Sequence, residues 1–105
     1  MSYEVIFSRA AAADLERLFD HVLEREMRSA AGDWALAERA IAAIRQACEF
    51  LAHSPFSCRK AGASPFVREL IIPFGASGYV ALFEICDERT VVVGAVRHQR
   101  EEDYH

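Results

Sequence analysis

Arginine and histidine side chains enter an otherwise apolar stretch at two places in the last third of the chain. Arg68 lies in the middle of one run of strand-forming residues, and Arg97 and His98 lie where the last such run ends. Histidine is the best general base among them, because its unperturbed pKa is about 6.5. A planar guanidinium suits a phosphoryl group. These three residues are therefore the candidates for acid–base chemistry and for binding a phosphate or a charged transition state.

Each of these residues also has a purely structural interpretation. An arginine within a strand commonly pairs with an acidic neighbour at the rim of a sheet. A histidine at the end of a strand is usually a partly exposed polar residue. Judged by residue type alone, the structural interpretation of Arg68 is the more frequent one.

Three predicted strands position these side chains. Runs rich in Val, Ile, Phe and Tyr, bounded by turn residues, predict strands over residues 66–72, 78–85 and 90–96. The connections are too short for crossover helices, so we expect an antiparallel meander of about residues 66–98. The last run is apolar at successive positions, which indicates a strand that is central or covered on both faces.

Two amphipathic helices precede the meander. Apolar residues at helical spacing predict a helix over about residues 9–28 with Ser8 as its cap, and a second helix over about residues 34–53. The apolar stripe of the second helix consists of Ala37, Ile41, Ile44, Cys48 and Leu51. The short turn between the helices predicts an antiparallel helical hairpin, about residues 9–53, whose stripe is buried against the sheet.

A short strand at residues 3–7 opens the chain, and we expect it to join the meander at one side. The element order is then strand, helix, helix, strand, strand, strand. It predicts a single α+β domain over residues 1–105, in which an antiparallel sheet is covered on one face by the helical hairpin.

Composition limits the classes of function. The chain has 105 residues, 52% of them hydrophobic, and a net charge of −4 with Lys60 as its only lysine. A domain of this size has little room for a deep enclosed pocket, and an acidic chain is a poor general binder of nucleic acid. We therefore expect function on a surface or in a shallow groove.

No pattern in the sequence calls for a metal or a cofactor. The histidines and cysteines lack metal-ligand spacing, and no glycine motif of the phosphate-binding kind is present. Three cysteines, with no CxxC pair and no signal peptide, predict free thiols in a reducing cytoplasm. No apolar run approaches membrane-spanning length, so we expect no membrane association.

The element order and three short segments resemble the RelE/ParE toxins of bacterial type II toxin–antitoxin pairs. Residues 67–70 (Val-Arg-Glu-Leu) resemble the family's arginine-bearing strand, and residues 78–83 resemble its hydrophobic second strand. Residues 93–101 resemble the family's strand that ends in Arg-His and a further basic residue, here Arg100. The similarity covers nearly the whole chain by element order.

The resemblance implies one of two mechanisms. RelE-like members are similar to ribonucleases that cut mRNA in the ribosome, and ParE-like members inhibit DNA gyrase without known hydrolytic chemistry. RNA cleavage needs a base, an acid and positive charge at the phosphorane. His98 would be the base, Arg97 and Arg68 the cations and Tyr104 a proton donor. In a binding toxin, the target-binding residues would be Arg68, Arg97, His98 and Arg100.

The charge of the chain favours the ParE-like branch. A ribosome-bound nuclease must approach an anionic surface, whereas this chain is acidic, has one lysine and carries the acidic run 101–103. We therefore expect a toxin that inhibits DNA gyrase by binding it, with a role in plasmid stabilisation. A ribosome-dependent mRNA endonuclease is the first alternative, and a non-toxic interaction module is the second.

The resemblance also implies a cognate antitoxin, ParD-like or of another family, whose C-terminal segment binds an apolar groove as a helix or an added strand. The aromatic surplus of this small chain suggests such a groove. The candidate antitoxin-binding residues are Trp34, Phe74, Tyr79 and Phe83. The alternative, structural interpretation is that most of these aromatic residues form the core.

Overall fold

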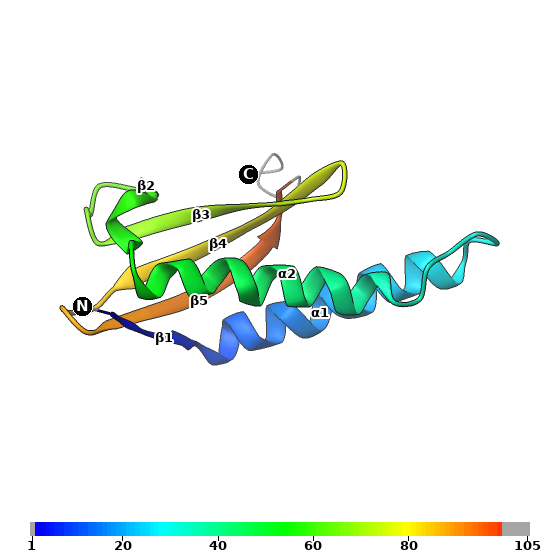
Figure 1. Ribbon diagram of the computed structural model, residues 1–105, viewed down its shortest axis with the longest axis horizontal. Helices are drawn as coiled ribbons and strands as arrows, with labels where there is room; N and C mark the ends of the chain where they lie inside the picture. Colours follow the sequence, from blue (N-terminus) through cyan, green and yellow to red (C-terminus); the bar gives the residue numbers. More distant parts are fainter. Residues whose placement is uncertain (1, 100–105) are drawn as a thin grey trace.

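The computed structural model describes residues 2–99 as two helices packed on one face of a five-stranded sheet (Figure 1). In chain order the main elements are β1 (Glu4–Phe7), α1 (Arg9–Met27), α2 (Leu36–Glu49), β2 (Arg59–Lys60), β3 (Val67–Phe74), β4 (Ser77–Ile85) and β5 (Thr90–His98). Two short 3₁₀ turns, η1 (Phe50–Ala52) and η2 (Pro55–Ser57), follow α2. The predicted α+β class and the order of the major elements are confirmed.

The sheet has the strand order β1-β5-β4-β3-β2 and is mixed rather than wholly antiparallel. The meander β3-β4-β5 is antiparallel, as predicted, but β1 pairs in parallel with β5. The reason is the path of the chain. The helical hairpin brings the chain back to the end of the sheet where β1 starts, so β3 runs in the same direction as β1. The chain then reverses direction twice, at the β3–β4 and β4–β5 turns, so β5 also runs in the direction of β1.

The core lies between the helical hairpin and the sheet. Four residues of the predicted α2 stripe, Ala37, Ile44, Cys48 and Leu51, are buried, and Ile41 is half-buried. Ile44, Cys48 and Leu51 belong to one cluster with sheet residues that include Ile72, Phe83, Val91, Val93 and Val96, and Ile41 packs against it. The predicted burial of the stripe is confirmed for every residue except Ile41. The α-helix itself is shorter than predicted, because its last turn tightens into η1 before Pro55.

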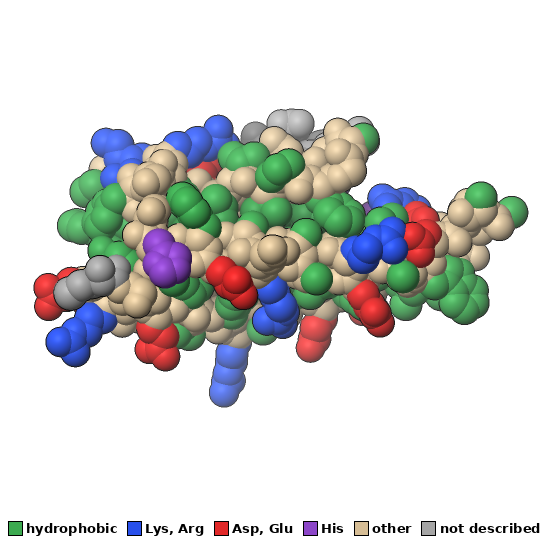
Figure 2. Space-filling view, viewed as in Figure 1, with side chains coloured by type: hydrophobic (Ala, Val, Ile, Leu, Met, Phe, Trp, Pro, Cys, Tyr) green, Lys and Arg blue, Asp and Glu red, His purple; other side chains and the backbone are tan. Residues whose placement is uncertain are grey.

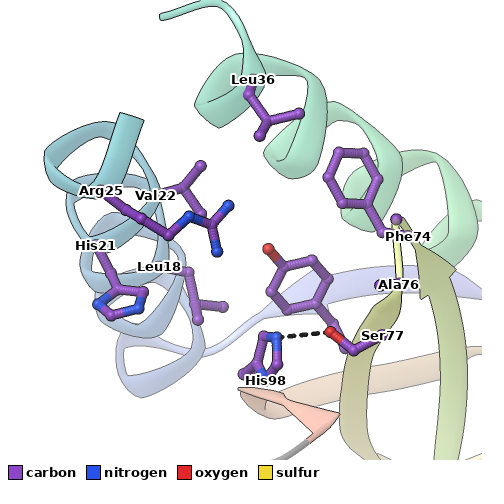
Figure 3. Close-up of a pocket in the computed structure, with 11 residues that line it drawn as sticks. Leu18, His21, Val22, Arg25, Leu36, Phe74, Ala76, Ser77 and His98 are labelled. Atoms are coloured by element: carbon purple, nitrogen blue, oxygen red, sulfur yellow. Dashed lines mark hydrogen bonds between the residues drawn. The ribbon is translucent and has the colours of Figure 1, made fainter. Parts of the chain in front are cut away.

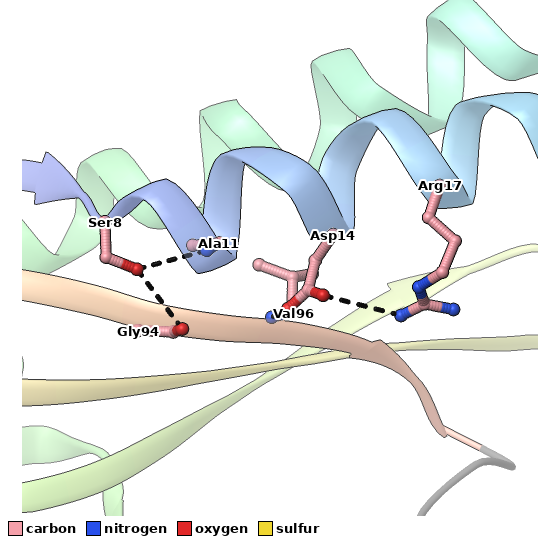
Figure 4. A network of polar contacts seen from close by, with 6 residues as sticks. All are labelled: Ser8, Ala11, Asp14, Arg17, Gly94 and Val96. Carbon is pink, nitrogen blue, oxygen red and sulfur yellow. Dashed lines mark hydrogen bonds and ion pairs between the residues drawn. The ribbon is translucent and has the colours of Figure 1, made fainter.

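Helix α1 covers the part of β5 that β1 does not reach (Figure 4). Strand β1 ends at Phe7, opposite Val93. The Ser8 hydroxyl accepts a hydrogen bond from the Ala11 N–H at 3.1 Å and donates one to the Gly94 carbonyl at 3.3 Å. One turn further along α1, the Val96 N–H donates to the Asp14 carboxylate at 2.9 Å. Side chains of α1 thus satisfy backbone groups of β5 that lack a strand partner.

We expect Asp14→Ala to lower the free energy of unfolding by about 1–2 kcal/mol, because the half-buried Val96 N–H loses a charged acceptor. Asp20→Ala is the matched control, since Asp20 is exposed on the same helix and the substitution changes charge and helix propensity equally. Urea unfolding of both variants measures the difference. Equal stability of the two variants would show that this contact does not stabilise the fold.

The helical hairpin extends well beyond the sheet, and its tip projects from one end of the molecule (Figure 1). The described part of the chain is accordingly elongated, with principal extents of 48 × 29 × 23 Å. Within residues 2–99, neither helix is long and apolar enough to span a membrane.

Candidate functional site

A cavity of about 600 Å³ opens between α1, the start of α2 and the turn that joins β3 to β4 (Figure 3). It is lined by Leu18, His21, Val22, Arg25, Leu36, Phe74, Gly75, Ala76, Ser77, Tyr79 and His98. Its walls are mostly apolar, and its polar groups are imidazole, guanidinium, phenol and hydroxyl.

Helical and strand periodicity place these residues on facing surfaces. Leu18, His21, Val22 and Arg25 recur at spacings of three and four, which puts all four on one side of α1. Ser77 and Tyr79 alternate along β4, and Tyr79 stands opposite His98 of β5 in the register. The sheet therefore contributes the aromatic side and α1 the basic side of the cavity.

The His98 imidazole is held by two neighbours from β4. Its Nε2 forms a hydrogen bond of 2.9 Å with the Ser77 hydroxyl, and its ring meets the Tyr79 ring edge-on at 5.6 Å. Tyr79 also contacts Phe74, with 6.1 Å between ring centroids. Burial raises the pKa of the Tyr79 phenol, so this group stays protonated at neutral pH. The result is a fixed imidazole at one wall of the cavity.

The lining of the cavity differs in charge from the chain as a whole. Its lining, as far as the structure describes it, contains Arg25, His21 and His98 and no carboxylate, although the chain has a net charge of −4. The Arg25 guanidinium forms an ion pair with the neighbouring Glu26 at 3.2 Å. The cavity can therefore receive apolar side chains together with an anionic or hydrogen-bond-accepting group.

Arg68 lies outside this cavity and is bound to the backbone of a loop. Its Nε donates to the Pro65 carbonyl at 2.8 Å, and its Nη1 donates to the carbonyls of Phe56 at 3.0 Å and Cys58 at 2.7 Å. The guanidinium also lies over the Phe56 ring, 5.2 Å from its centroid. These contacts hold the loop between α2 and β3 against the sheet. The observed partners of Arg68 are thus backbone carbonyls, and not the acidic side chain or the phosphate considered from the sequence.

The structure does not bring Arg68, Arg97 and His98 together. Arg68 stands opposite Phe83 on β4 and His98 stands opposite Tyr79, four residues apart, which is roughly 14 Å along the strand. Arg97 alternates with His98 and so projects from the opposite face of the sheet, where it is exposed. Arg100 and Tyr104 lie outside the described residues.

The four aromatic candidates for antitoxin binding have different environments. Phe74 and Tyr79 line the cavity. Phe83 is only 1% exposed and belongs to the core, so a partner cannot reach it without unfolding the sheet. Trp34 is 66% exposed in the turn at the tip of the helical hairpin, before α2 begins, and not in the helix as predicted.

The cavity also contains residues that were not predicted as functional, namely His21, Arg25 and Ser77. Helical spacing was the signal that could have identified the first two, because they share a face with Leu18 and Val22. No comparable signal marks Ser77, whose contact with His98 depends on the register of β4 and β5.

The remaining chemical features of interest in the described part of the chain are groups that could bind a metal and thiols that could react. Across residues 2–99, no group of three or more histidine, cysteine or acidic residues is arranged to hold a metal ion. The three cysteines are free thiols. Cys48 is buried in the core, and this burial raises the pKa of its thiol to about 11. A thiol with a raised pKa forms little of the nucleophilic thiolate.

Comparison with known proteins identifies the family. The family model described as the ParE toxin of the type II toxin–antitoxin system parDE matches residues 5–103. Toxin RelE1 of Caulobacter vibrioides is 34% identical over 85 residues, which cover 81% of this chain and 82% of that protein.

Two solved structures share the fold. A chain of the chromosomal ParDE system from P. aeruginosa superposes with a TM-score of 0.67 at 18% identity, covering 92% of this chain and 96% of that one. A chain of the toxin–antitoxin complex RelBE2 from Mycobacterium tuberculosis gives a TM-score of 0.63 at 22% identity, covering 94% and 100%. The family match over residues 5–103 and the 34% identity with toxin RelE1 show that the chain belongs to the ParE toxin family of type II toxin–antitoxin systems.

Proposed function

We propose that this toxin acts by binding a protein target, DNA gyrase, and that a cognate antitoxin neutralises it by occupying the cavity between the helical hairpin and the β3–β4 turn. The observation that carries the binding mechanism is the engagement of Arg68 by three loop carbonyls. Arg68 holds this loop roughly 14 Å along the strand from the position opposite His98, so it does not serve there as a phosphate-binding cation. The acidic charge of the chain supports the same mechanism.

The shape of the cavity supports an antitoxin segment as its occupant. Leu36, Phe74 and Val22 form apolar walls on three elements (Figure 3), and the projecting hairpin extends one of these walls away from the sheet (Figure 1). A helix or strand with apolar side chains fits such a groove. Both solved relatives come from toxin–antitoxin systems, and one was determined as a toxin–antitoxin complex.

The proposal is tested by inducing the toxin in cells, alone and together with the antitoxin encoded beside it. We expect growth arrest by the toxin alone and recovery with the antitoxin. Supercoiling by purified gyrase should fall when purified toxin is added, and mRNA on ribosomes should stay intact. Specific mRNA cuts with unchanged supercoiling would contradict the gyrase proposal.

For a binding toxin, we expect His98→Gln to change the toxin dose that arrests growth by roughly threefold or less, because binding needs no general base and His98 lines the cavity assigned to the antitoxin. Ser77→Ala is the matched control, because it removes the hydrogen bond to Nε2 and leaves the imidazole in place. Growth curves over a range of inducer concentrations measure the dose, and thermal unfolding checks that both variants fold.

A second candidate function, mRNA cleavage, is favoured by one specific observation. The cavity gathers two imidazoles, His21 and His98, with the guanidinium of Arg25 and the phenol of Tyr79. Two imidazoles can act as base and acid, and a guanidinium can stabilise the phosphorane. In that case His98→Gln would reduce cutting of ribosome-bound mRNA on the order of 10²–10⁴-fold and would abolish growth arrest.

A further inference from the structure

A second hollow of about 470 Å³ lies at the end of the sheet away from His98. It is formed by the end of β4 and by the loop between α2 and β3. Its apolar part is built from Tyr3, Phe56, Phe66 and Ile85. Phe56 and Phe66 are 48% and 50% exposed, which is unusual for two adjacent phenylalanines in a small domain. We call the surface around Phe56 and Phe66 the phenylalanine patch. Figure 2 shows hydrophobic side chains exposed at the end of the molecule opposite the hairpin tip.

The two rings of the phenylalanine patch are held in place by their surroundings. They contact each other edge to face, with 6.2 Å between centroids. The Phe56 carbonyl accepts a hydrogen bond from Arg68, whose guanidinium also lies over the Phe56 ring. The Phe66 carbonyl accepts a hydrogen bond from the Ile85 N–H at 2.8 Å. Rings that are already ordered lose little freedom when a partner covers them, which favours binding.

The rim of the phenylalanine patch is acidic. Glu84, Asp87 and Glu88 line the hollow, and none of its described lining residues is a lysine or arginine. The Arg89 N–H donates to the Asp87 carboxylate at 2.8 Å and lowers the pKa of that group, so Asp87 is ionised at neutral pH. An acidic rim attracts lysine and arginine side chains and repels the phosphates of nucleic acid.

The two hollows therefore differ in the polar groups that line them and lie at opposite ends of the sheet. The cavity beside His98 is lined by basic groups, and the phenylalanine patch is lined by acidic groups. Two surfaces lined so differently favour different partners, because a lysine or arginine side chain finds carboxylates at the phenylalanine patch and none among the described lining residues of the cavity.

We infer that the phenylalanine patch is a docking site for a protein segment that presents an apolar side chain flanked by lysine or arginine, and that this segment belongs to the toxin's target. The inference rests on the proposed function, because it assigns the target and the antitoxin to different surfaces. Arg68 is then a positioning residue, which holds Phe56 in the conformation that the target meets.

The test uses two variants of the full chain. Phe66→Ala removes an apolar contact, and the double variant Glu84→Lys with Glu88→Lys reverses the charge of two exposed rim residues without touching the core. The matched controls are Phe50→Ala, since Phe50 is 46% exposed and does not line the hollow, and Glu38→Lys with Glu49→Lys on α2. Each variant is measured for growth arrest, for binding to purified gyrase and for affinity towards the antitoxin.

We expect both patch variants to raise the dose that arrests growth, and the dissociation constant for gyrase, by roughly 30-fold or more, as for a central interface residue. Antitoxin affinity should change by about twofold or less, and the controls should resemble the wild type. Raising the salt concentration should weaken gyrase binding by the wild type more than by the charge-reversed variant.

Three results would overturn the inference. Full growth arrest by the charge-reversed variant would show that the target does not use the patch, while the proposed function would stand. Loss of antitoxin affinity in the patch variants would assign the surface to the antitoxin instead. A wild-type chain that neither arrests growth nor binds gyrase would remove the proposed function and this inference together.

Discussion

Antitoxin affinity is expected to fall by roughly 100-fold or more when Leu36 is replaced by aspartate, a loss of about 2.7 kcal/mol. Leu36 is half-buried and forms part of the apolar wall of the cavity beside His98. An apolar segment that covers this wall would have to remove water from the new carboxylate, and central interface residues commonly cost 2 kcal/mol or more.

The same substitution should leave the fold intact. Leu36 is the first residue of α2, and an acidic side chain in the first turn interacts favourably with the helix dipole. Ala35→Asp is the matched control, because it adds the same charge one residue earlier, at an exposed position that does not line the cavity. Isothermal titration calorimetry with the purified antitoxin measures both affinities. Wild-type affinity of the Leu36→Asp variant would show that the antitoxin binds elsewhere.

The largest expected effect on stability comes from Ile44→Ala, which should lower the free energy of unfolding by about 2–5 kcal/mol. Ile44 has no exposed surface and lies in the middle of the α2 stripe, where it belongs to the main core cluster. The substitution removes buried methyl and methylene groups and leaves a cavity that the rigid sheet can fill only in part.

Ile44→Val is the graded control, with an expected loss of about 0.5–1.5 kcal/mol, because it removes a single methylene group. Urea unfolding monitored by circular dichroism gives both values if the slope with denaturant stays constant. A loss below about 0.5 kcal/mol for Ile44→Ala would mean that α2 does not pack on the sheet through this stripe.

Local pattern was sufficient for most of the fold. The spacing of Ile44, Cys48 and Leu51 defined the buried side of α2, and runs of strand-forming residues defined β3, β4 and β5. Helical and strand periodicities are properties of neighbouring residues, so a sequence expresses them directly.

Two features of the sheet could not be predicted in this way. Strand β2 consists of Arg59 and Lys60, which are exposed and polar, and it pairs with β3 in a loop that Arg68 fastens to the sheet. The parallel pairing of β1 with β5 depends on the direction in which the helical hairpin returns the chain. Both depend on the path of the backbone between elements, which leaves no periodic signal in the residues.

The sequence by itself determined the family, the α+β class and His98 as the residue best suited to acid–base chemistry. Only the tertiary structure decided which groups His98 meets, because Ser77, Tyr79 and the basic side of α1 come from distant segments. It also decided that Arg68 binds loop carbonyls and that Arg97 projects from the opposite face of the sheet. The physical reason is that a residue's type sets the chemistry it can perform, whereas strand register and packing between elements set the partners within its reach.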